Sequence, residues 1–240
     1  MSPAGAGLRA AAGTLAAAGL AACAAAPDAA PTGGSPTAAP SDVVVATADE
    51  AFPSRTAEDW VTWADHVVVA TAVDEAESLL PREEGNPPGE RSVRRDVTLR
   101  VDELAWSSAD PRRAAQGESF VLPAPWTIVR DDVRTRVAIE DTPRVEVGHS
   151  YVIALLWQPA AEDPARPGRW TWLGQDALLP YDDGTIGVGE LEGAVRDEPL
   201  RVPEDDVRFS FEDAMAGRTA ADLVAVLDRT APDEREGYGW

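Results

Sequence analysis

The chain has 240 residues and a formal net charge of −21, because 42 acidic residues outnumber 21 basic ones. This charge repels nucleic-acid phosphates and anionic lipid headgroups, so polyanions are excluded as partners. The single cysteine excludes an intramolecular disulfide. All 21 basic residues are arginine, a bias typical of GC-rich genomes such as those of actinobacteria.

The first 22 residues have the composition of an export signal. Arg9 is their one charged side chain, and 10–22 is an unbroken run of small or apolar residues. Such a run has the length of a signal-peptide core and is too short to cross a bilayer, which takes about 20 residues. We therefore expect 1–22 to be a signal peptide.

Leu20, Ala21, Ala22 and Cys23 resemble the lipobox of bacterial lipoproteins, in which an aliphatic residue and two small residues precede a cysteine. The resemblance implies cleavage before Cys23 and a diacylglyceryl group on its sulfur, which would attach the protein to the outer face of the cytoplasmic membrane. Two or more acyl chains suffice for stable anchoring. An ordinary secretory signal and an alanine-rich disordered start are the alternatives.

The segment 24–41 consists of Ala, Pro, Thr, Gly and Ser with one aspartate. It cannot bury enough apolar surface to offset the entropy of ordering, so it predicts a disordered spacer that follows Cys23. The periodic patterns of a globular domain cover 42–232, a length sufficient for one domain with a core. The last residues, 233–240, are expected to form a flexible tail.

Short β-branched or alternating stretches predict that most of the domain is β-structure. The expected strands are 43–45, 66–73, 93–104, 119–122, 134–139, 151–157, 170–173, 177–181 and 185–188. The acidic, proline-broken stretch 75–91 predicts a loop, and Pro123 and Pro125 are expected to end the strand before them. The sequence Asp-Asp-Gly at 182–184 predicts a hairpin turn.

Three sequences that resemble capping boxes mark the expected helices. They run from Thr56 to Asp59, from Ser210 to Asp213 and from Thr219 to Asp222. The last of them precedes an apolar stripe at helical spacing, which predicts a helix packed on the sheet.

These elements predict a mainly β domain, a single small antiparallel β-barrel or sandwich with short N-terminal and C-terminal helices. The order of Ala-Asp-His-Val-Val-Val at 64–69, the alternating 97–101 and Val-Gly-His-Ser-Tyr-Val-Ile at 147–153 is similar to that in netrin-type modules, including tissue inhibitors of metalloproteinases. This likeness implies an OB-like barrel over about 64–157. The family's disulfide cysteines are missing and Cys23 lies far from the barrel, so protease inhibition is not carried over.

No catalytic motif is complete. Gly148, His149 and Ser150 match the start of the G-x-S-x-G nucleophile elbow, but Tyr151 and Val152 follow where x and glycine should stand. A turn into a strand is the better interpretation. We therefore predict no catalytic residue.

Metal ligands are also poorly represented. The two histidines, His66 and His149, lack the H-x-x-H or H-E-x-x-H spacing, and His66 is expected to be structural. The acidic clusters lie at 131–132, 140–141, 182–183 and 204–206. They lack the spacing of calcium loops and are expected to be solvated turns. We predict no metal and no cofactor.

Trp170 and Trp172 are the candidate ligand contacts, because residues two apart on a strand share a face. An exposed pair would stack on a sugar or a protein partner. A pair that covers one end of the core is the alternative, and we favour it because large aromatic side chains are usually buried.

The sequence therefore predicts a lipid-anchored extracytoplasmic protein, or a secreted one if the lipobox is not used. We expect a non-enzymatic binding module at the cell envelope. Its expected partners are the membrane, through the N-terminal lipid, and an envelope protein or a wall glycan. The alternative is a surface-anchored hydrolase that uses acidic residues.

Overall fold

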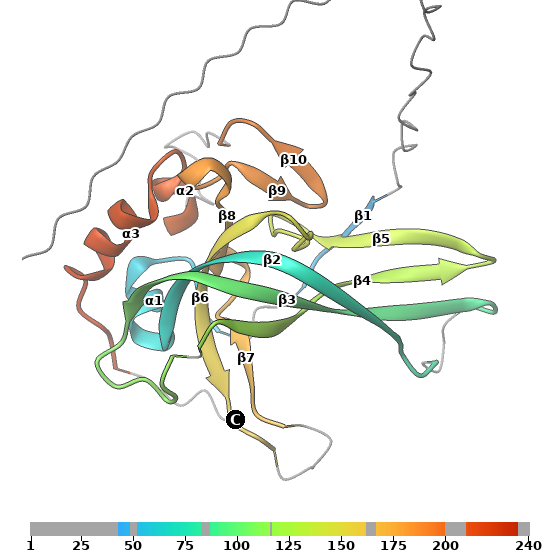
Figure 1. The fold of residues 1–240 in the computed structure, drawn as a ribbon, viewed down its shortest axis with the longest axis horizontal. Coiled ribbons are helices and arrows are strands. Elements are labelled where there is room, and N and C mark those ends of the chain that lie inside the picture. The colour runs from blue at the N-terminus through green and yellow to red at the C-terminus, as the bar shows by residue number, and fades with distance from the viewer. Residues whose placement is uncertain are drawn as a thin grey trace, which may run out of the picture. The chain divides into compact units, whose positions relative to one another are not determined.

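The computed structural model describes residues 43–48, 52–82, 87–115, 117–161, 167–199 and 210–234. The expected signal peptide with its cleavage site at 20–22, the lipidated Cys23 and the spacer up to 41 lie outside these ranges, as do residues 235–240 of the expected tail. The described residues form a mainly β domain with one large sheet and one two-stranded sheet (Figure 1).

Seven strands cross the large sheet in the order β1-β5-β4-β3-β2-β6-β7, and β8 also pairs with β6. Their bounds are β1 Val43–Ala46, β2 His66–Leu79, β3 Glu90–Ser107, β4 Ser119–Arg130, β5 Val133–Ile139, β6 Ser150–Gln158, β7 Arg169–Trp172 and β8 Leu178–Pro180. Every pair is antiparallel except β1 with β5. The small sheet is a hairpin of β9 Gly189–Leu191 and β10 Ala194–Arg196.

The large sheet curls without closing. Strands β1 and β7 stand at the two ends of its strand order, and the curl brings β7 near β4. A barrel needs its two edge strands to pair with each other, and these two do not. The mainly β class expected from the sequence is confirmed, but of the barrel or sandwich expected, a closed barrel does not form: the sheet is open and curled.

Strand β6 and the first half of β2, residues 66–72, lie at the centre of the body and are buried on both faces. Tyr151 and Ile153 of β6 face the inside of the curl, where they join a core cluster with residues of β3, β4 and β7. Val152 and Ala154 face the other way, into a second cluster that includes residues of the helices. Burial on both faces explains why β6 is the most continuously apolar strand.

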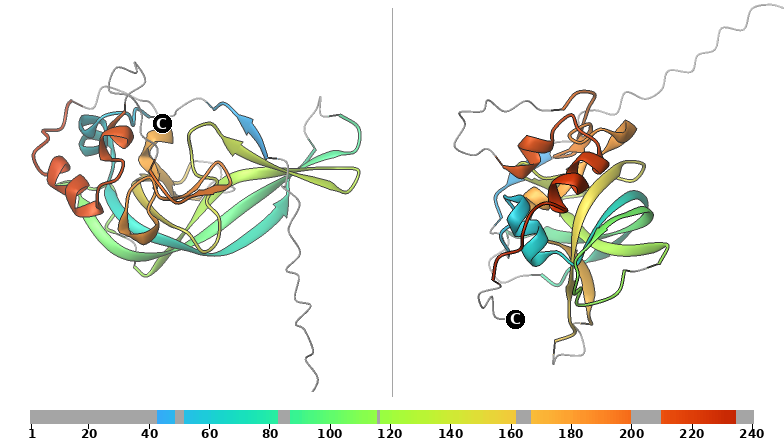
Figure 2. Two further views of the ribbon diagram at one scale, coloured as in Figure 1. Left: turned by 90° about the horizontal axis from the view of Figure 1, so that it is seen from above. Right: turned by 90° about the vertical axis from the view of Figure 1, so that its left-hand side faces the viewer.

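Three short helices gather at one end of the sheet (Figure 2). They are α1 Ala57–Trp63, α2 Phe211–Met215 and α3 Ala220–Leu227. Each begins at an expected capping box, in which Thr56, Ser210 or Thr219 accepts a hydrogen bond from the backbone N–H three residues later. The capping-box predictions are confirmed.

The ribbon of β2 and β3 is longer than the sequence predicts. Residues 75–79 and 90–91, expected in a loop, continue the two strands: 75–79 pair with 93–97 of β3, and 90–91 pair with 129–130 of β4. Glu75 lies opposite Val97, and Glu77 lies opposite Arg95. Charged side chains occupy positions where strand periodicity calls for apolar ones, so hydrophobic alternation could not reveal this extension.

Pro123 and Pro125 do not end β4. The strand pairs with β3 past both prolines, but its pairing with β5 starts only at Thr127. Neither proline lies in the part of β4 that hydrogen-bonds to β5, so the missing N–H groups interrupt no pairing on that side. On the β3 side, Pro125 lies opposite a register shift between Val93 and Arg95. Proline is tolerated at such edges and bulges.

The hairpin forms later in the chain than expected. Residues 182–184 are a short 3₁₀ turn, and 185–188 are not a strand. The hairpin connects β9 to β10 through Glu192 and Gly193, whose φ angles are 53° and 77°. Two positive φ angles are what a type I′ turn requires.

Candidate functional site

A groove lies at the end of the sheet that is farthest from the helices, where β2, β3, β4 and β5 extend together (Figure 1). Its volume is about 560 Å³. The lining residues come from all four strands and their connections: Glu77, Ser78, Leu79, Gly89, Arg91, Val93, Val129, Asp131, Asp132 and Arg134.

Strand register places the groove on the same face as the inner core cluster. Leu79 pairs with Val93, Arg91 pairs with Val129, and Val129 pairs with Arg134. On β3, Val93 is four residues from Val97, a member of that core cluster, so both point to the inside of the curl. The groove is therefore the open continuation of the face that is filled with apolar side chains in the body.

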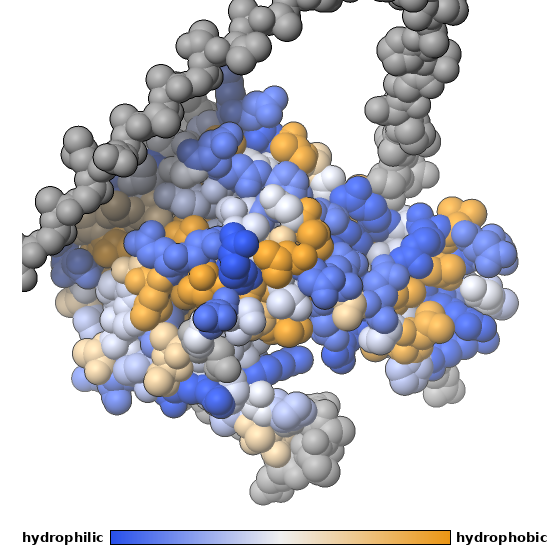
Figure 3. Space-filling view, viewed as in Figure 1, coloured by the Kyte–Doolittle hydropathy of each residue, from blue (hydrophilic) through white to orange (hydrophobic). Residues whose placement is uncertain are grey.

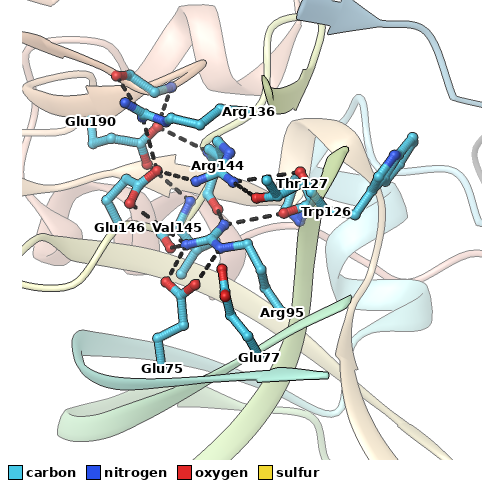
Figure 4. Close-up of polar contacts among 12 residues, drawn as sticks. Glu75, Glu77, Arg95, Trp126, Thr127, Arg136, Arg144, Val145, Glu146 and Glu190 are labelled. Atoms are coloured by element: carbon cyan, nitrogen blue, oxygen red, sulfur yellow. Dashed lines mark hydrogen bonds and ion pairs between the residues drawn. The ribbon is translucent and has the colours of Figure 1, made fainter. Parts of the chain in front are cut away.

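A cluster of charged side chains separates the groove from the core (Figure 4). Arg95 lies at its centre with 1% of its side chain exposed. Its Nε and Nη2 donate to the two carboxylate oxygens of Glu75 at 2.7 and 2.6 Å. It also donates to the carbonyls of Pro125, Arg144 and Val145 at 2.9–3.2 Å. The five N–H groups of an arginine make such multiple bonding feasible.

Arg144 extends the cluster across the sheet. Its guanidinium donates to the carbonyl of Val137 at 3.0 Å, to the hydroxyl of Thr127 at 2.9 Å and to the carboxylate of Glu146. Arg136 binds the same carboxylate at 2.9 Å. The formal charges balance, with Arg95, Arg136 and Arg144 against Glu75, Glu146 and Glu190.

Hydrogen bonds from Arg95 hold the pKa of Glu75 below its ordinary value of 4.5, so Glu75 is a carboxylate near neutral pH. Burial lowers the pKa of Arg144, and the neighbouring charge of Arg95 adds to this effect. Burial opposes the charge of Arg95 as well, but the carboxylates of Glu75 and Glu146 outweigh it and raise the pKa of Arg95. These carboxylates are occupied by arginines and are not available to a ligand.

Glu190 of β9 fastens the small hairpin to this cluster. Its carboxylate is buried and accepts hydrogen bonds from the backbone N–H groups of Arg144, Val145 and Gly193 and from the hydroxyl of Tyr151, at 2.6–3.0 Å. Burial raises the pKa of Tyr151, which keeps this donor protonated. Val145 has a φ of 60°, a rare conformation for a β-branched residue. Glu190 therefore holds a strained segment in place.

The turn between β4 and β5 is also strained. Asp131 and Asp132 have φ angles of 49° and 65°, in the conformation that Asn-Gly usually supplies at this turn. A left-handed residue with a side chain costs about 1–2 kcal/mol, although aspartate is among those that tolerate it best. Both side chains are exposed at the groove.

Three charged groups of the groove are uncommitted. Arg91, Asp131 and Asp132 form no ion pair or side-chain hydrogen bond with any other residue that the structure describes. Glu77, by contrast, pairs with Arg134. The groove thus presents one guanidinium and two carboxylates to a ligand, over the side chains of Val93 and Val129.

The structure separates the two histidines. His66 is buried, with Nδ1 at 2.9 Å from the hydroxyl of Ser107 and Nε2 at 2.8 Å from the carbonyl of Arg113, which fits the structural role expected for it. His149 opens β6, with its Nδ1 at 2.5 Å from Asp182.

Ser150 does not complete a catalytic arrangement with His149. Its backbone N–H donates to Asp182 at 2.9 Å, and its hydroxyl lies 2.9 Å from the hydroxyl of Thr71. A nucleophile needs a base within hydrogen-bonding reach, and the described contacts show no such pair here. The segment 148–150 is a turn into a strand, as the sequence indicates.

Trp170 has only 4% of its surface exposed and packs edge-on against Trp157, with ring centroids 5.2 Å apart. Trp172 is half-buried against the same inner core cluster. The two indoles thus do not form an exposed pair. A ligand contact at Trp170 and Trp172 stays a prediction.

The acidic clusters of the sequence are dispersed. Asp131 and Asp132 line the groove, Asp182 binds His149, and 204–206 lie outside the described residues. Among the residues in the described ranges, no group of three or more His, Cys, Asp or Glu side chains is arranged to hold a metal ion. Within the same ranges, no helix has the length and apolar content that a membrane span requires.

The sequence analysis missed the buried charge cluster and the groove. One signal was present, since Arg95 stands in register with Val93 and Val97 in an otherwise apolar alternation. Nothing in the sequence marked Asp131 and Asp132 as groove residues, because the pairing between distant strands decides which side chains surround the groove. No protein-family model, curated protein or solved structure matches this chain.

Proposed function

We propose that the protein is a non-enzymatic binding module, anchored by lipid on Cys23 to the outer face of the cytoplasmic membrane, and that it binds its partner at the groove. The observation that carries the binding role is the contrast between two neighbouring charge clusters. Arg95 and its partners are buried and mutually satisfied, whereas Arg91, Asp131 and Asp132 are exposed and uncommitted at the groove. Uncommitted charges around a concave surface are typical of binding sites.

The anchor is supported by the sequence at 20–23 alone. It is tested by metabolic labelling with a palmitate analogue. We expect the wild-type protein to be labelled and membrane-bound, and Cys23→Ala to be unlabelled and released. An unlabelled wild-type protein that stays in the membrane fraction would remove the anchor from the proposal.

The binding role is tested by a photo-crosslinking amino acid placed at Leu79 on the groove, in intact cells. Val195 on β10 is the matched control, because the two side chains are similarly exposed, at 61% and 62%. We expect a discrete crosslinked species from position 79 and none from position 195. Equal crosslinking at both positions, or none at either, would count against the groove.

A hydrolase that uses acidic residues is the second candidate, because Glu77, Asp131 and Asp132 surround one groove. Glu77 is paired with Arg134, and the two aspartates are exposed at a turn. Neither arrangement positions an acid and a base across a closed site. A hydrolytic activity that is lost in Asp131→Asn would establish this candidate instead.

The finer fold assignment also belongs to the proposal. We infer kinship with OB-like, netrin-type modules over about 64–157, supported by the antiparallel succession of β2, β3, β4 and β5 in a curled sheet. A solved structure of such a module with the same strand order and the same parallel β1 would test it.

A further inference from the structure

The groove has an aliphatic rim as well as charges. Leu79 is 61% exposed and lines the groove together with Val93 and Val129. Figure 3 shows hydrophobic patches set among hydrophilic ones at this end of the domain. Exposed aliphatic side chains surrounded by polar ones are typical of protein–protein contact surfaces.

The lining of the groove disfavours a glycan. Sugar rings are held largely by stacking on exposed aromatic side chains. None of the residues that line the groove is aromatic, and Trp170 is buried elsewhere. The groove offers aliphatic side chains and ionic groups, which match those of a polypeptide.

The sign of the uncommitted charge indicates what such a polypeptide carries. Asp131 and Asp132 outnumber Arg91, and Glu77 is neutralised by Arg134. The chain as a whole has a formal net charge of −21, which attracts cationic partners over a distance. A basic side chain at the turn satisfies the two carboxylates, and Arg91 remains for a carbonyl or a carboxylate of the same partner.

On the basis of the proposed function, we propose that the groove binds an extended segment of a partner polypeptide, with a lysine or arginine side chain at Asp131 and Asp132 and aliphatic side chains on Leu79 and Val129. This proposal selects an envelope protein over a wall glycan as the partner.

The test uses the full mature chain and three capped pentapeptides, Val-Thr-X-Thr-Val, in which X is lysine, glutamine or glutamate. Backbone amide NMR shifts of the groove residues report binding at peptide concentrations up to about 1 mM. We expect the lysine peptide to shift these signals most and the glutamate peptide least. We also expect binding of the lysine peptide to weaken as salt is added.

The double variant Asp131→Asn, Asp132→Asn removes both charges and keeps residues that tolerate the left-handed turn. We expect it to bind the lysine peptide about fivefold more weakly, the effect of one exposed ion pair. The control variant Asp74→Asn, Asp110→Asn removes two exposed carboxylates that do not line the groove, and we expect unchanged binding.

Each contrary result has a distinct meaning. If the glutamate peptide binds as well as the lysine peptide, or the Asp131→Asn, Asp132→Asn variant binds the lysine peptide normally, the basic partner is overturned and the groove remains a binding site. If a chitin oligomer shifts the groove signals and no peptide does, the polypeptide is overturned in favour of a glycan. If no ligand shifts them and crosslinking at position 79 also fails, the proposed function falls together with this inference.

Discussion

Arg95 is buried on the inner face of the sheet, and its charge is held by the carboxylate of Glu75 on β2, the carbonyl of Pro125 on β4 and the carbonyls of Arg144 and Val145 in a loop. A buried charge of this kind stabilises the fold only while its partners stay in place. Its neighbour Arg94 pairs with Asp96 at the surface and differs from Arg95 chiefly in burial.

Because Arg94 and Arg95 differ in burial, substituting each of them compares a buried with an exposed ion pair. We expect Arg95→Met to lower the free energy of unfolding by about 3–5 kcal/mol, because it leaves Glu75 and three carbonyls without their donor. Arg94→Met should lower it by less than about 1 kcal/mol, since its ion pair is exposed to water. Urea unfolding measures both, and equal losses would contradict the role assigned to Arg95.

The lowered pKa of Glu75 predicts how the free energy of unfolding depends on pH. The pKa of Glu75 is lowered in the folded state, so the unfolded chain binds the proton more readily, and the stabilisation is complete above the unfolded value of 4.5. It is lost as the pH falls through the folded-state pKa.

Urea unfolding between about pH 3 and 7 should therefore show a stability decrease on the acid side that is smaller in Glu75→Gln. Glu103→Gln is the control, because Glu103 is exposed and has no partner among the described residues. An identical pH profile in wild type and Glu75→Gln would refute the assignment.

At the scale of elements, the hairpin of β9 and β10 depends on one carboxylate. We expect Glu190→Gln to destabilise the protein by about 3 kcal/mol, because an amide cannot accept from four donors at once. Hydrogen exchange at the amides of Arg144, Val145 and Gly193 should accelerate. Glu192→Gln, on the same hairpin, removes a single hydrogen bond from the backbone of Asp141 and should change little.

The turn of β4 and β5 should show a conflict between stability and binding. Glycine adopts the conformation of Asp132 without strain, so Asp132→Gly should raise the free energy of unfolding by about 1 kcal/mol. The same variant should bind the lysine peptide less tightly. Thermal unfolding and the peptide titration measure the two effects. A less stable Asp132→Gly variant would show that the backbone at Asp132 is not strained.

Elements whose formation depends on nearby residues were predictable from the sequence. The three helices begin at Thr56, Ser210 and Thr219 as expected, because a capping box is complete within four residues. The strand extension at 75–79 was not predictable, since its ion pairs join it to Arg95 and Arg134, 20 and 57 residues away in the sequence. The groove depends on the same distant pairings, and only Arg95 in its apolar register marked this region beforehand.

On the scale of the whole molecule, a net charge of −21 sets the response to salt. Like charges repel one another more in the compact state, and added salt screens this repulsion. We expect the midpoint of thermal unfolding to rise by about 2–4 °C when NaCl increases from roughly 0.02 to 0.5 M. KCl should act equally, and a decrease would mean that exposed ion pairs outweigh the repulsion.

The parallel pairing of β1 with β5 has a mechanical consequence. Val43 lies opposite Arg136 and Ala46 opposite Ile139, so both strands start at the end of the sheet that holds the groove. If Cys23 carries the proposed lipid, tension between the membrane and a partner bound in the groove would pull the two strand starts apart, and the four residue pairs would separate one after another. Each residue released from β1 would lengthen the unpaired segment between Cys23 and the sheet by about 3.3 Å. Strand β1 would thus detach from β5 under load while the two core clusters stay folded.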